Sequence, residues 1–405
     1  MALLSVADAL ARVLQRAAPL PRDDAPLTEA FGRVLTDDVA ALRTQPPQDL
    51  SAMDGYAVRS ADVATAPVTL RLVGEVAAGH PFAGVVGPGE AARIFTGGVV
   101  PPGADTIVIQ ENTKRDGERV VVLAPSPAGR HIRPAGLDFR AGEVLLPRGH
   151  RLTDRDLMLA AAMNHPRLPV HRRPRIAVLG TGDELKPPGS TPGPGEIIYS
   201  NGFALMALAR AEGAEVTDLG VVRDEVEATI AAVRRARESR ADILLTTGGA
   251  SVGDYDLVQR GLAAEGLALS FWKVALRPGR PLMHGHLGPM HVLGLPGNPV
   301  SAYVCAVLFL VPLIRRLCGR ADVEPSTESA VLGVDLPEND ERADYLRATL
   351  AVRPDGTLVA TPVPVQDSSM MAALAKADCL LIRPPHAARA AAGSRCVILR
   401  LTRPF

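Results

Sequence analysis

The sequence predicts a multidomain fold in which an α/β region with a mainly parallel sheet is joined to separate β regions. Residues 175–320 contain short apolar runs without polar alternation, each ending in glycine and then in carboxylates or hydroxyls, as buried parallel strands do. Residues 45–140 and the residues beyond 325 instead show short β runs with glycine and proline between them. A chain of 405 residues is also too long for one ordinary core, so two to four domains are expected.

The α/β region is expected to alternate strands and helices. Its expected strands are 175–179, 215–221, 242–246 and 291–295, and its expected helices are 201–212, 224–238 and 300–317. Asn298 and Pro299 fit the N-cap and the first position of the last helix. Because the connections allow right-handed crossovers, the loops after the parallel strands should meet in one crevice beyond their carboxyl ends. We therefore expect the functional site in that crevice.

The β region before residue 140 is predicted to be inserted into a helical element. Residues 5–18 should form an amphipathic helix, with Ser5 and Asp8 arranged as a capping box, and a second helix is expected at 152–163. The expected β strands are 68–73, 106–109 and 120–123, the last two flanking a turn at Asp116-Gly117, and then 347–352, 358–363 and 396–401 in the C-terminal region.

Charge and composition argue against several classes of protein. Lys+Arg and Asp+Glu both number 44, whereas nucleic-acid-binding proteins usually carry a basic surplus. The apolar stretch 300–314 is shorter than a bilayer-spanning helix and fits a core helix, and the first residues lack the features of a signal peptide. We therefore expect a cytoplasmic protein that binds neither nucleic acid nor membrane. The four cysteines are expected to be buried free thiols.

Common nucleotide-binding, metal-binding and catalytic motifs give little support. The sequence contains neither a P-loop motif nor a strand-linked G-x-G-x-x-G, and its nine histidines have no metal-ligand spacing, which disfavours zinc and iron. Residues 249–253 have the G-x-S-x-G form of a nucleophile elbow, with Ser251 as its serine. Acyl transfer is a weak alternative, because the loop runs on through Asp254 and no oxyanion segment lies upstream.

Acidic and basic side chains are both predicted to line the crevice. The carboxylates that follow its strands are Asp183, Glu184, Asp224, Asp254 and Asp256. Any one of them alone fits a helix cap or a solvated loop acid, but oxygen ligands gathered without His or Cys suit Mg²⁺. Arg277 and Arg280 flank a tight turn and the loop 296–299 precedes a helix N-terminus, which together favour an anion site over a solvated hairpin. This combination indicates phosphate-ester or oxyanion chemistry.

Five motifs make the sequence resemble one known family. They are SAMDGYA (Ser51–Ala57), RIFTGG (Arg93–Gly98), TGDEL (Thr181–Leu185), GGASVGD (Gly248–Asp254) and GLPGNPVS (Gly294–Ser301). In this order they resemble the molybdopterin molybdenumtransferase family, the MoeA family, to which the E domain of gephyrin belongs. The resemblance covers nearly the whole chain.

The resemblance implies a domain organisation, an assembly and a reaction. The implied domains are an elongated helical domain (1–44 and 139–170), an inserted β domain (45–138), an α/β molybdopterin-binding domain (171–322) and a C-terminal β-barrel (323–405). A homodimer is implied, in which the β domain of one subunit supplies Asp54 and Thr96 to the cleft of the other. The implied reaction inserts molybdenum from molybdate into adenylylated molybdopterin, with Mg²⁺-dependent release of AMP.

The motif positions also imply the residues of the site. Catalytic roles are implied for Asp54, Thr96, Asp138, Glu184, Asp224 and Asp254, of which Glu184, Asp224 and Asp254 would hold Mg²⁺. Substrate-binding roles are implied for Thr181, Gly182, Asp183, Gly248, Gly249, Ser251, Pro296, Gly297 and Asn298, and molybdate-binding roles for Arg277, Arg280, Ser301, Arg342 and Ser368.

One motif departs from the family, and two rival functions remain open. The family commonly has Lys-Pro-Gly-Lys where this sequence has Arg277-Pro-Gly-Arg280, and a planar guanidinium recognises an oxyanion differently from a lysine point charge. Compositional drift is the favoured cause, because the chain has only four lysines. The rival functions are molybdopterin adenylyltransferase activity and a non-catalytic, gephyrin-type scaffold. Molybdopterin adenylyltransferase and molybdoenzyme maturation proteins are the candidate partners.

Overall fold

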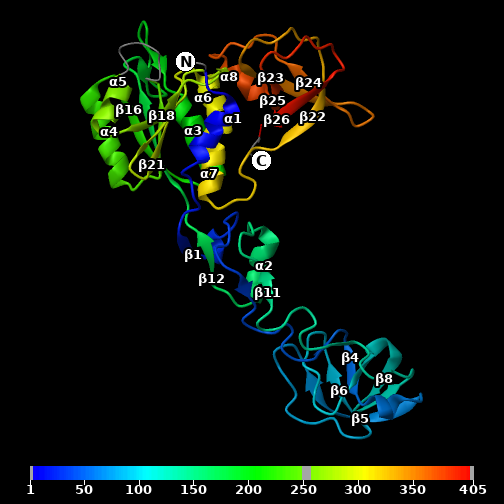
Figure 1. Cartoon of the computed structure of the whole chain (residues 1–405). Helices are drawn as coiled ribbons and strands as arrows, with labels where there is room; N and C mark the ends of the chain where they lie inside the picture. Colours follow the sequence, from blue (N-terminus) through cyan, green and yellow to red (C-terminus); the bar gives the residue numbers. More distant parts are fainter. Residues whose placement is uncertain (1–2, 249–256, 402–405) are drawn as a thin grey trace. The chain divides into compact units, whose positions relative to one another are not determined.

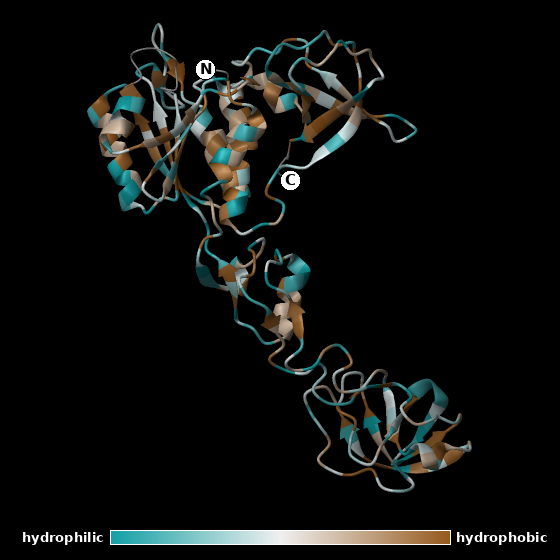
Figure 2. Cartoon of the chain, viewed as in Figure 1, coloured by the Kyte–Doolittle hydropathy of each residue, from teal (hydrophilic) through white to brown (hydrophobic). Residues whose placement is uncertain are grey.

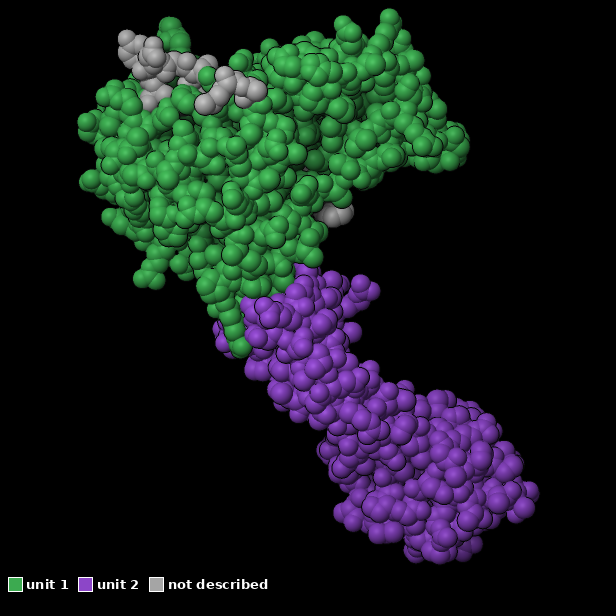
Figure 3. Space-filling view, viewed as in Figure 1, with its two compact units in different colours: residues 1–23, 32–34, 170–405 green, residues 24–31, 35–169 purple. Residues whose placement is uncertain are grey.

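The chain is divided by its contacts into two compact units. The computed structural model describes residues 3–248 and 257–401. Unit 1 contains residues 1–23, 32–34 and 170–405, and unit 2 contains residues 24–31 and 35–169 (Figure 3). The division into four domains stays a prediction, but the N-terminal helix clearly packs within unit 1.

Unit 1 contains a six-stranded sheet in the order β16-β13-β17-β21-β20-β18 (Figure 1). Its strands are β13 (Arg175–Thr181), β16 (Glu215–Val222), β17 (Ile243–Thr247), β18 (Ala268–Trp272), β20 (Met283–Leu287) and β21 (Met290–Leu295). β16, β13, β17 and β21 are parallel neighbours, whereas β20 runs antiparallel to β21 and to β18. The four strands predicted from the apolar runs are therefore confirmed, each within two residues at either end.

Helices cover both faces of this sheet. They are α1 (Val6–Leu14), α3 (Asn201–Ala211), α6 (Pro299–Cys305) and α7 (Val311–Leu317) on one face, and α4 (Val226–Glu238) and α5 (Leu257–Ala264) on the other (Figure 1). The Ser5 side chain caps α1 by accepting from the Asp8 N–H, as predicted. The helix ends four residues earlier than expected, at Leu14.

The apolar stretch after Asn298 forms the main core helix of unit 1. α6 and α7 are joined by a π-helical segment, Ala306–Leu310, which the sequence did not predict. Pro312 accounts for it, since proline lacks the N–H needed for the regular helical bond. The helix Pro299–Leu317 is long and apolar enough to cross a bilayer, but 83% of its most apolar window is buried inside the fold. Brown, hydrophobic residues mark this helix in Figure 2.

A closed five-stranded β-barrel follows in unit 1. Its strands are β22 (Thr327–Leu332), β23 (Ala343–Val352), β24 (Leu358–Pro362), β25 (Cys379–Arg383) and β26 (Arg395–Arg400). The ring closes because the long β23 pairs with β24 at one end and with β25 at the other. β19 (Leu276–Arg277) adds to β23, and α8 (Met371–Lys376), which was not predicted, lies between β24 and β25 in the chain. The implied barrel is confirmed.

Unit 2 is built around a second six-stranded sheet, in the order β7-β4-β6-β5-β9-β8. Its strands are β4 (Gly55–Val58), β5 (Val68–Val76), β6 (Glu90–Ile94), β7 (Thr106–Ile109), β8 (Thr113–Asp116) and β9 (Arg119–Val122). The expectation that 106–109 and 120–123 flank the turn at Asp116 is wrong. β9 pairs across that turn with β8, whose polar and mostly exposed residues hide its strand character.

The remaining elements are short. They are helix α2 (Asp154–Ala162), the 3-10 helices Leu27–Glu29, Ser60–Val63 and Gln110–Asn112, and four pairs of short strands. The pairs are β1 (Arg22–Pro26) with β12 (Arg167–His171), β2 (Val39–Ala40) with β11 (Val144–Leu146), β3 (Leu50–Ser51) with β10 (Ile132–Arg133), and β14 (Leu185–Lys186) with β15 (Ile197–Ile198). The four cysteines are free, as expected, although Cys318 and Cys396 are only half-buried.

Candidate active-site cleft

The parallel sheet of unit 1 has a topological switch point between β13 and β17. From β13 the chain passes through α3 to β16 on one side, and α4 then returns it to β17 on the other side. Ligands of open α/β sheets bind beyond the carboxyl ends of the strands at such a point. Here the two loops approach closely, since a Cβ atom on Gly248 would lie 2.2 Å from the Thr181 carbonyl oxygen. Gly248 also has a φ of +93°, so glycine is required there.

A cleft of about 670 Å³ opens at this switch point. The predicted residues that line it are Thr181, Glu184, Asp224, Gly248, Pro296, Gly297, Asn298 and Ser301. They come from the ends of β13, β16, β17 and β21, so the structure brings together residues from three of the five motifs. The predicted residues Gly249, Ser251 and Asp254 lie outside the described residues.

The cleft also contains two polar residues that sequence reasoning missed, Asn201 and Tyr199. Asn201 donates from its amide to the Thr247 hydroxyl at 2.9 Å and to the Gly297 carbonyl at 2.7 Å, and so ties two of the loops together. The hydroxyl groups of Thr181 and Tyr199 are buried without a hydrogen-bond partner among the described residues. Burial raises the pKa of Tyr199 to about 12, so this phenol stays a hydrogen-bond donor at neutral pH. The sequence did give one indication for Asn201, because it is the first residue of a predicted helix directly beyond the crevice.

Three carboxylates form an acidic corner of the cleft. The Asp224 backbone N–H donates to the Asp183 carboxylate at 3.4 Å, while Glu184 lines the cleft beside them. Burial raises the pKa of Asp224, and the negative charges of Asp183 and Glu184 raise it further. Its Oδ1 atom is also buried without a hydrogen-bond partner among the described residues. A divalent cation would satisfy this oxygen and offset the repulsion, which fits the predicted Mg²⁺ ligands Glu184 and Asp224.

A loop of the barrel region closes the cleft on its other side. Ser369 and Met371 line the cleft, and Ser368 accepts from the Asn298 amide at 2.8 Å and from the Val300 N–H at 3.0 Å. Asn298 therefore occupies the predicted N-cap position, but its side chain binds Ser368 instead of capping the helix. The Val300 N–H, at the helix N-terminus where an anion site was expected, donates to the Ser368 carbonyl oxygen.

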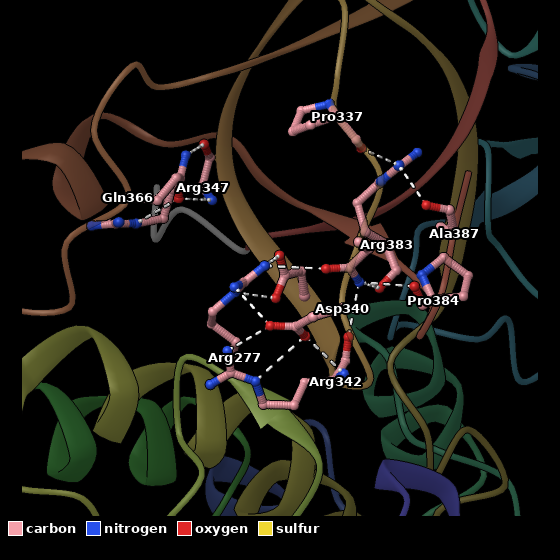
Figure 4. Close-up of polar contacts among 11 residues, drawn as sticks. Arg277, Pro337, Asp340, Arg342, Arg347, Gln366, Arg383, Pro384 and Ala387 are labelled. Atoms are coloured by element: carbon pink, nitrogen blue, oxygen red, sulfur yellow. Dashed lines mark hydrogen bonds and ion pairs between the residues drawn. The ribbon is translucent and has the colours of Figure 1, made fainter. Parts of the chain in front are cut away.

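The buried Arg347 of β23 anchors this loop. Its guanidinium donates to the Gln366 side chain at 3.2 Å and to the Asp367 carbonyl at 2.7 Å (Figure 4). The loop is contributed by a different region of the chain from the motifs around the crevice. Sequence pattern alone carried little signal for Ser369 and Met371, because their contacts with the cleft are long-range.

Two of the arginines predicted to bind molybdate are engaged by carboxylates instead. Arg277 forms ion pairs with Asp344 and with Asp340, the latter at 3.1 Å, and also donates to Asn339 (Figure 4). Arg342 pairs with Asp340 at 2.7 Å, and these arginines lower the pKa of Asp340 to about 2. Neither arginine is among the residues that line the cleft. Two positive and two negative charges balance here, so this cluster carries no surplus charge for an anion.

The predicted residues Arg280, Gly182 and Asp183 of unit 1 are not among the residues that line the cleft. Arg280 is exposed and makes no side-chain hydrogen bond within the described part of the chain. Gly182 has a φ of +150°, and a Cβ there would lie 2.6 Å from the Glu184 carboxylate. Asp183 is exposed and reaches the cleft only through its contact with Asp224.

The three predicted residues of unit 2 lie in two places. Asp54 accepts from the backbone N–H and the hydroxyl of Thr96, each at 2.7 Å. These bonds lower the pKa of Asp54, with a smaller contribution from Arg93, so its carboxylate stays ionised. The guanidinium of Arg93 lies over the Phe95 ring at 4.7 Å. Asp138 is exposed in a separate loop, where its backbone N–H donates to the Gln45 carbonyl at 3.0 Å.

Comparisons with known proteins identify matches along the whole chain. Family models match residues 4–164 (MoeA N-terminal region, domains I and II), 177–316 (probable molybdopterin-binding domain) and 329–401 (MoeA C-terminal region, domain IV). A molybdopterin molybdenumtransferase of Nostoc is 39% identical, covering 80% of this chain and 76% of the relative, and one of Haemophilus influenzae is 33% identical over 92% of each. The crystal structure of a molybdopterin biosynthesis MoeA protein from Pyrococcus horikoshii superposes with a TM-score of 0.84 at 28% identity, covering 98% of this chain and 99% of that one.

Proposed function

Since the chain belongs to the molybdopterin molybdenumtransferase (MoeA) family, and is thus a transferase of molybdenum cofactor biosynthesis, we propose that its cleft inserts molybdenum from molybdate into adenylylated molybdopterin with Mg²⁺-dependent release of AMP. The observation that carries this proposal is the acidic corner at the switch point of the sheet, beside the Thr181 and Tyr199 hydroxyls, which have no hydrogen-bond partner among the residues that the structure describes. We further propose that the protein acts in the cytoplasm as a homodimer.

The residues of the cleft suit this substrate. Glu184 and Asp224 would hold Mg²⁺, which neutralises phosphate charge when bound. The Thr181 hydroxyl and the glycine backbone at Gly248, where the loops after β13 and β17 approach closely, would contact the adenylylated end of the substrate. Asn201 holds the loops that carry Thr247 and Gly297 in place through its two amide hydrogen bonds. Such preorganised polar groups are the main source of catalysis in reactions that transfer charged groups.

A molybdate pocket is proposed at the α6 side of the cleft. Ser301 is 5% exposed and lines the cleft there, and the exposed guanidinium of Arg280 follows the turn that begins at Arg277. Arg280 is a better candidate for the oxyanion than Arg277 or Arg342, because those two are held by aspartates. A planar guanidinium can donate two parallel hydrogen bonds to an oxyanion.

The decisive experiment follows AMP release from adenylylated molybdopterin. Turnover should require both Mg²⁺ and molybdate, so omitting either component, or adding a chelator in excess, should reduce AMP to background. Glu184→Gln keeps the side-chain shape and should lower turnover at least about 10²-fold. Glu238→Gln, an exposed acid on α4, is the matched control and should behave as wild type. Full turnover in excess chelator would contradict the proposed metal dependence.

Assays on the same purified protein distinguish the rival functions. An adenylyltransferase would form adenylylated molybdopterin from ATP and molybdopterin, releasing pyrophosphate, which this protein should not do. A serine hydrolase would be labelled by a fluorophosphonate at Ser251, which should stay unmodified. A non-catalytic scaffold would release no AMP under any condition.

A further inference from the structure

Three histidines gather on one face of the β20–β21 hairpin. His284 and His286 are two residues apart on β20, and His291 of β21 pairs directly with His286. Alternate residues of a strand and their cross-strand partners project from the same face of a sheet. One ring nitrogen from each histidine lies within 4.8 Å of the others. The expectation that the histidines are scattered is therefore wrong for these three, because the spacing H-x-H followed by a hairpin turn was not recognised.

The three imidazoles are buried, and two of their ring nitrogens have no hydrogen-bond partner among the described residues. His284, His286 and His291 are 0%, 6% and 4% exposed. The Nδ1 atom of His284 and the Nε2 atom of His286 have no hydrogen-bond partner among the described residues. The polar contact within the cluster is a long one, 3.5 Å between His284 Nε2 and His291 Nδ1. Core histidines usually hydrogen-bond both ring nitrogens, so this arrangement needs a further partner.

The surroundings favour neutral imidazoles with free lone pairs. Burial lowers the pKa of His284 to about 3 and that of His291 to about 4. The Phe271 ring lies 5.6 Å from the His284 ring. The charges that act on the cluster are those of Arg16, which is exposed, and of Asp242, which pairs with Arg172. Neutral imidazole nitrogens bind borderline transition-metal ions well and Mg²⁺ poorly.

We propose that His284, His286 and His291 form a three-imidazole site for a divalent transition-metal ion such as Zn²⁺. Zinc–nitrogen bonds of about 2.0–2.1 Å would place the three nitrogens roughly 3.3 Å apart. The ring nitrogens lie within 4.8 Å of one another, so a pair would move together by at most about 1.5 Å on binding. A solvent molecule would complete the tetrahedron. Ligation through His284 Nδ1 and His286 Nε2 would give both atoms the partner that they lack among the described residues.

This site is separate from the cleft and does not depend on the proposed function. His291 pairs with Ile243 at the first residue of β17, whereas the cleft residue Thr247 pairs with Leu295 at the last. Four residues of extended chain span about 13 Å. The ion would therefore be structural, holding together the β20–β21 hairpin, which lies between β17 and β18 in the sheet.

The test measures Zn²⁺ bound by the full-length, metal-depleted protein in excess Mg²⁺, which saturates oxygen-rich sites. Wild type should retain one Zn²⁺ per chain after dialysis, and its Tm should rise with added Zn²⁺. His286→Leu should retain none and show no rise in Tm, whereas His80→Ala, an exposed histidine in unit 2, should match wild type. Equal retention by wild type and His286→Leu would overturn the proposal, as would the absence of bound Zn²⁺ in wild type.

Two further measurements do not depend on the folding of a histidine variant. Co²⁺ bound to the wild-type protein should show the intense visible absorption of a tetrahedral site, and Zn²⁺ should displace it; a weak octahedral spectrum alone would contradict three-imidazole ligation. Arg16→Gln removes a positive charge that acts on His286 and His291 and should tighten Zn²⁺ binding severalfold. A weaker affinity in this variant would contradict the assigned position of the ion.

Discussion

Asp224 illustrates how the cleft trades stability for function. Its folded-state pKa is raised above the ordinary value of 3.8, first by burial and then by Asp183 and Glu184. The folded state therefore binds a proton more readily than the unfolded state does. Stability falls as pH rises through the raised pKa, and at neutral pH the ionised carboxylate is a net cost to the fold. Functional sites commonly carry such a cost.

We expect Asp224→Asn to stabilise the protein and to abolish its activity. In Mg²⁺-free buffer at pH 7 the Tm should rise by roughly 1–2 °C, because one of three neighbouring negative charges is removed. The gain should vanish in acid, where wild-type Asp224 is protonated. Thermal melts at pH 7 and at a pH below 3.8, where the carboxyl is protonated in both the folded and the unfolded state, check the stability, and AMP release at pH 7 checks the activity. A lower Tm at pH 7 would mean that the repulsion is already neutralised within the fold.

Gly248→Ala tests the close approach of the loops that follow β13 and β17. The new Cβ would meet the Thr181 carbonyl oxygen, so the loop must shift, and we expect a loss of roughly 1–3 kcal/mol of stability and of about 10²-fold in turnover. Gly117→Ala is the matched control, since Gly117 also has a positive φ, of 56°, but a Cβ atom added there would have nothing within 4 Å. If the two variants lose the same amount, backbone strain alone explains the effect and the close approach does not matter.

The residue types at strand ends predicted which residues line the cleft, but they did not predict the ion pairs that Arg277 forms. Thr181, Glu184, Asp224 and Gly248 could be assigned because loops after parallel strands converge by geometry. Arg277 was expected to bind molybdate, but it pairs with Asp340 and Asp344. Both aspartates come from the barrel region, more than sixty residues away in the sequence. A local sequence pattern therefore cannot predict ion pairs between residues so far apart in the chain.

At the scale of elements, β19 and β23 are held together by Arg277, and this assignment can be tested against the predicted molybdate role. Arg277→Lys keeps the charge but removes most of the donors to Asp344, Asp340 and Asn339, so we expect a loss of about 1 kcal/mol of stability with little change in the molybdate KM. Arg280→Ala should instead raise the molybdate KM at least about tenfold with little change in stability. The reverse pattern would return Arg277 to the pocket.

The elements that the sequence predicted are those with a clear hydrophobic period. The buried parallel strands and α4 fall near their expected bounds, because their patterns are set by burial against one sheet. The π-helical segment and β8 were missed, for different reasons. The first depends on how the chain accommodates Pro312 within a buried helix, and the second pairs through its backbone while its side chains face solvent.

At the scale of the whole molecule, the proposed homodimer makes a quantitative prediction. If Asp54 acts in the cleft of the partner subunit, mixing Asp54→Ala with Glu184→Ala subunits should restore activity, because each mixed dimer has one cleft with both residues intact. Random exchange would place half the dimers in the mixed form, so about a quarter of wild-type AMP release is the ceiling. Mass spectrometry of differently tagged subunits would verify the exchange. Confirmed exchange without recovered activity would place the whole cleft within one chain.

The position of α1 in unit 1 has a consequence for how the protein is made. α1 ends at Leu14, yet it packs against α7, which begins at Val311. About 300 residues, including all of unit 2, must leave the ribosome in between. At roughly 5–20 residues per second, the apolar face of α1 waits on the order of 15–60 s for its partner. Unit 2 can fold during that interval, whereas the apolar face of the nascent N-terminal helix must be shielded from water. We therefore expect ribosome-associated chaperones to crosslink to residues 6–14 on stalled chains shorter than 311 residues.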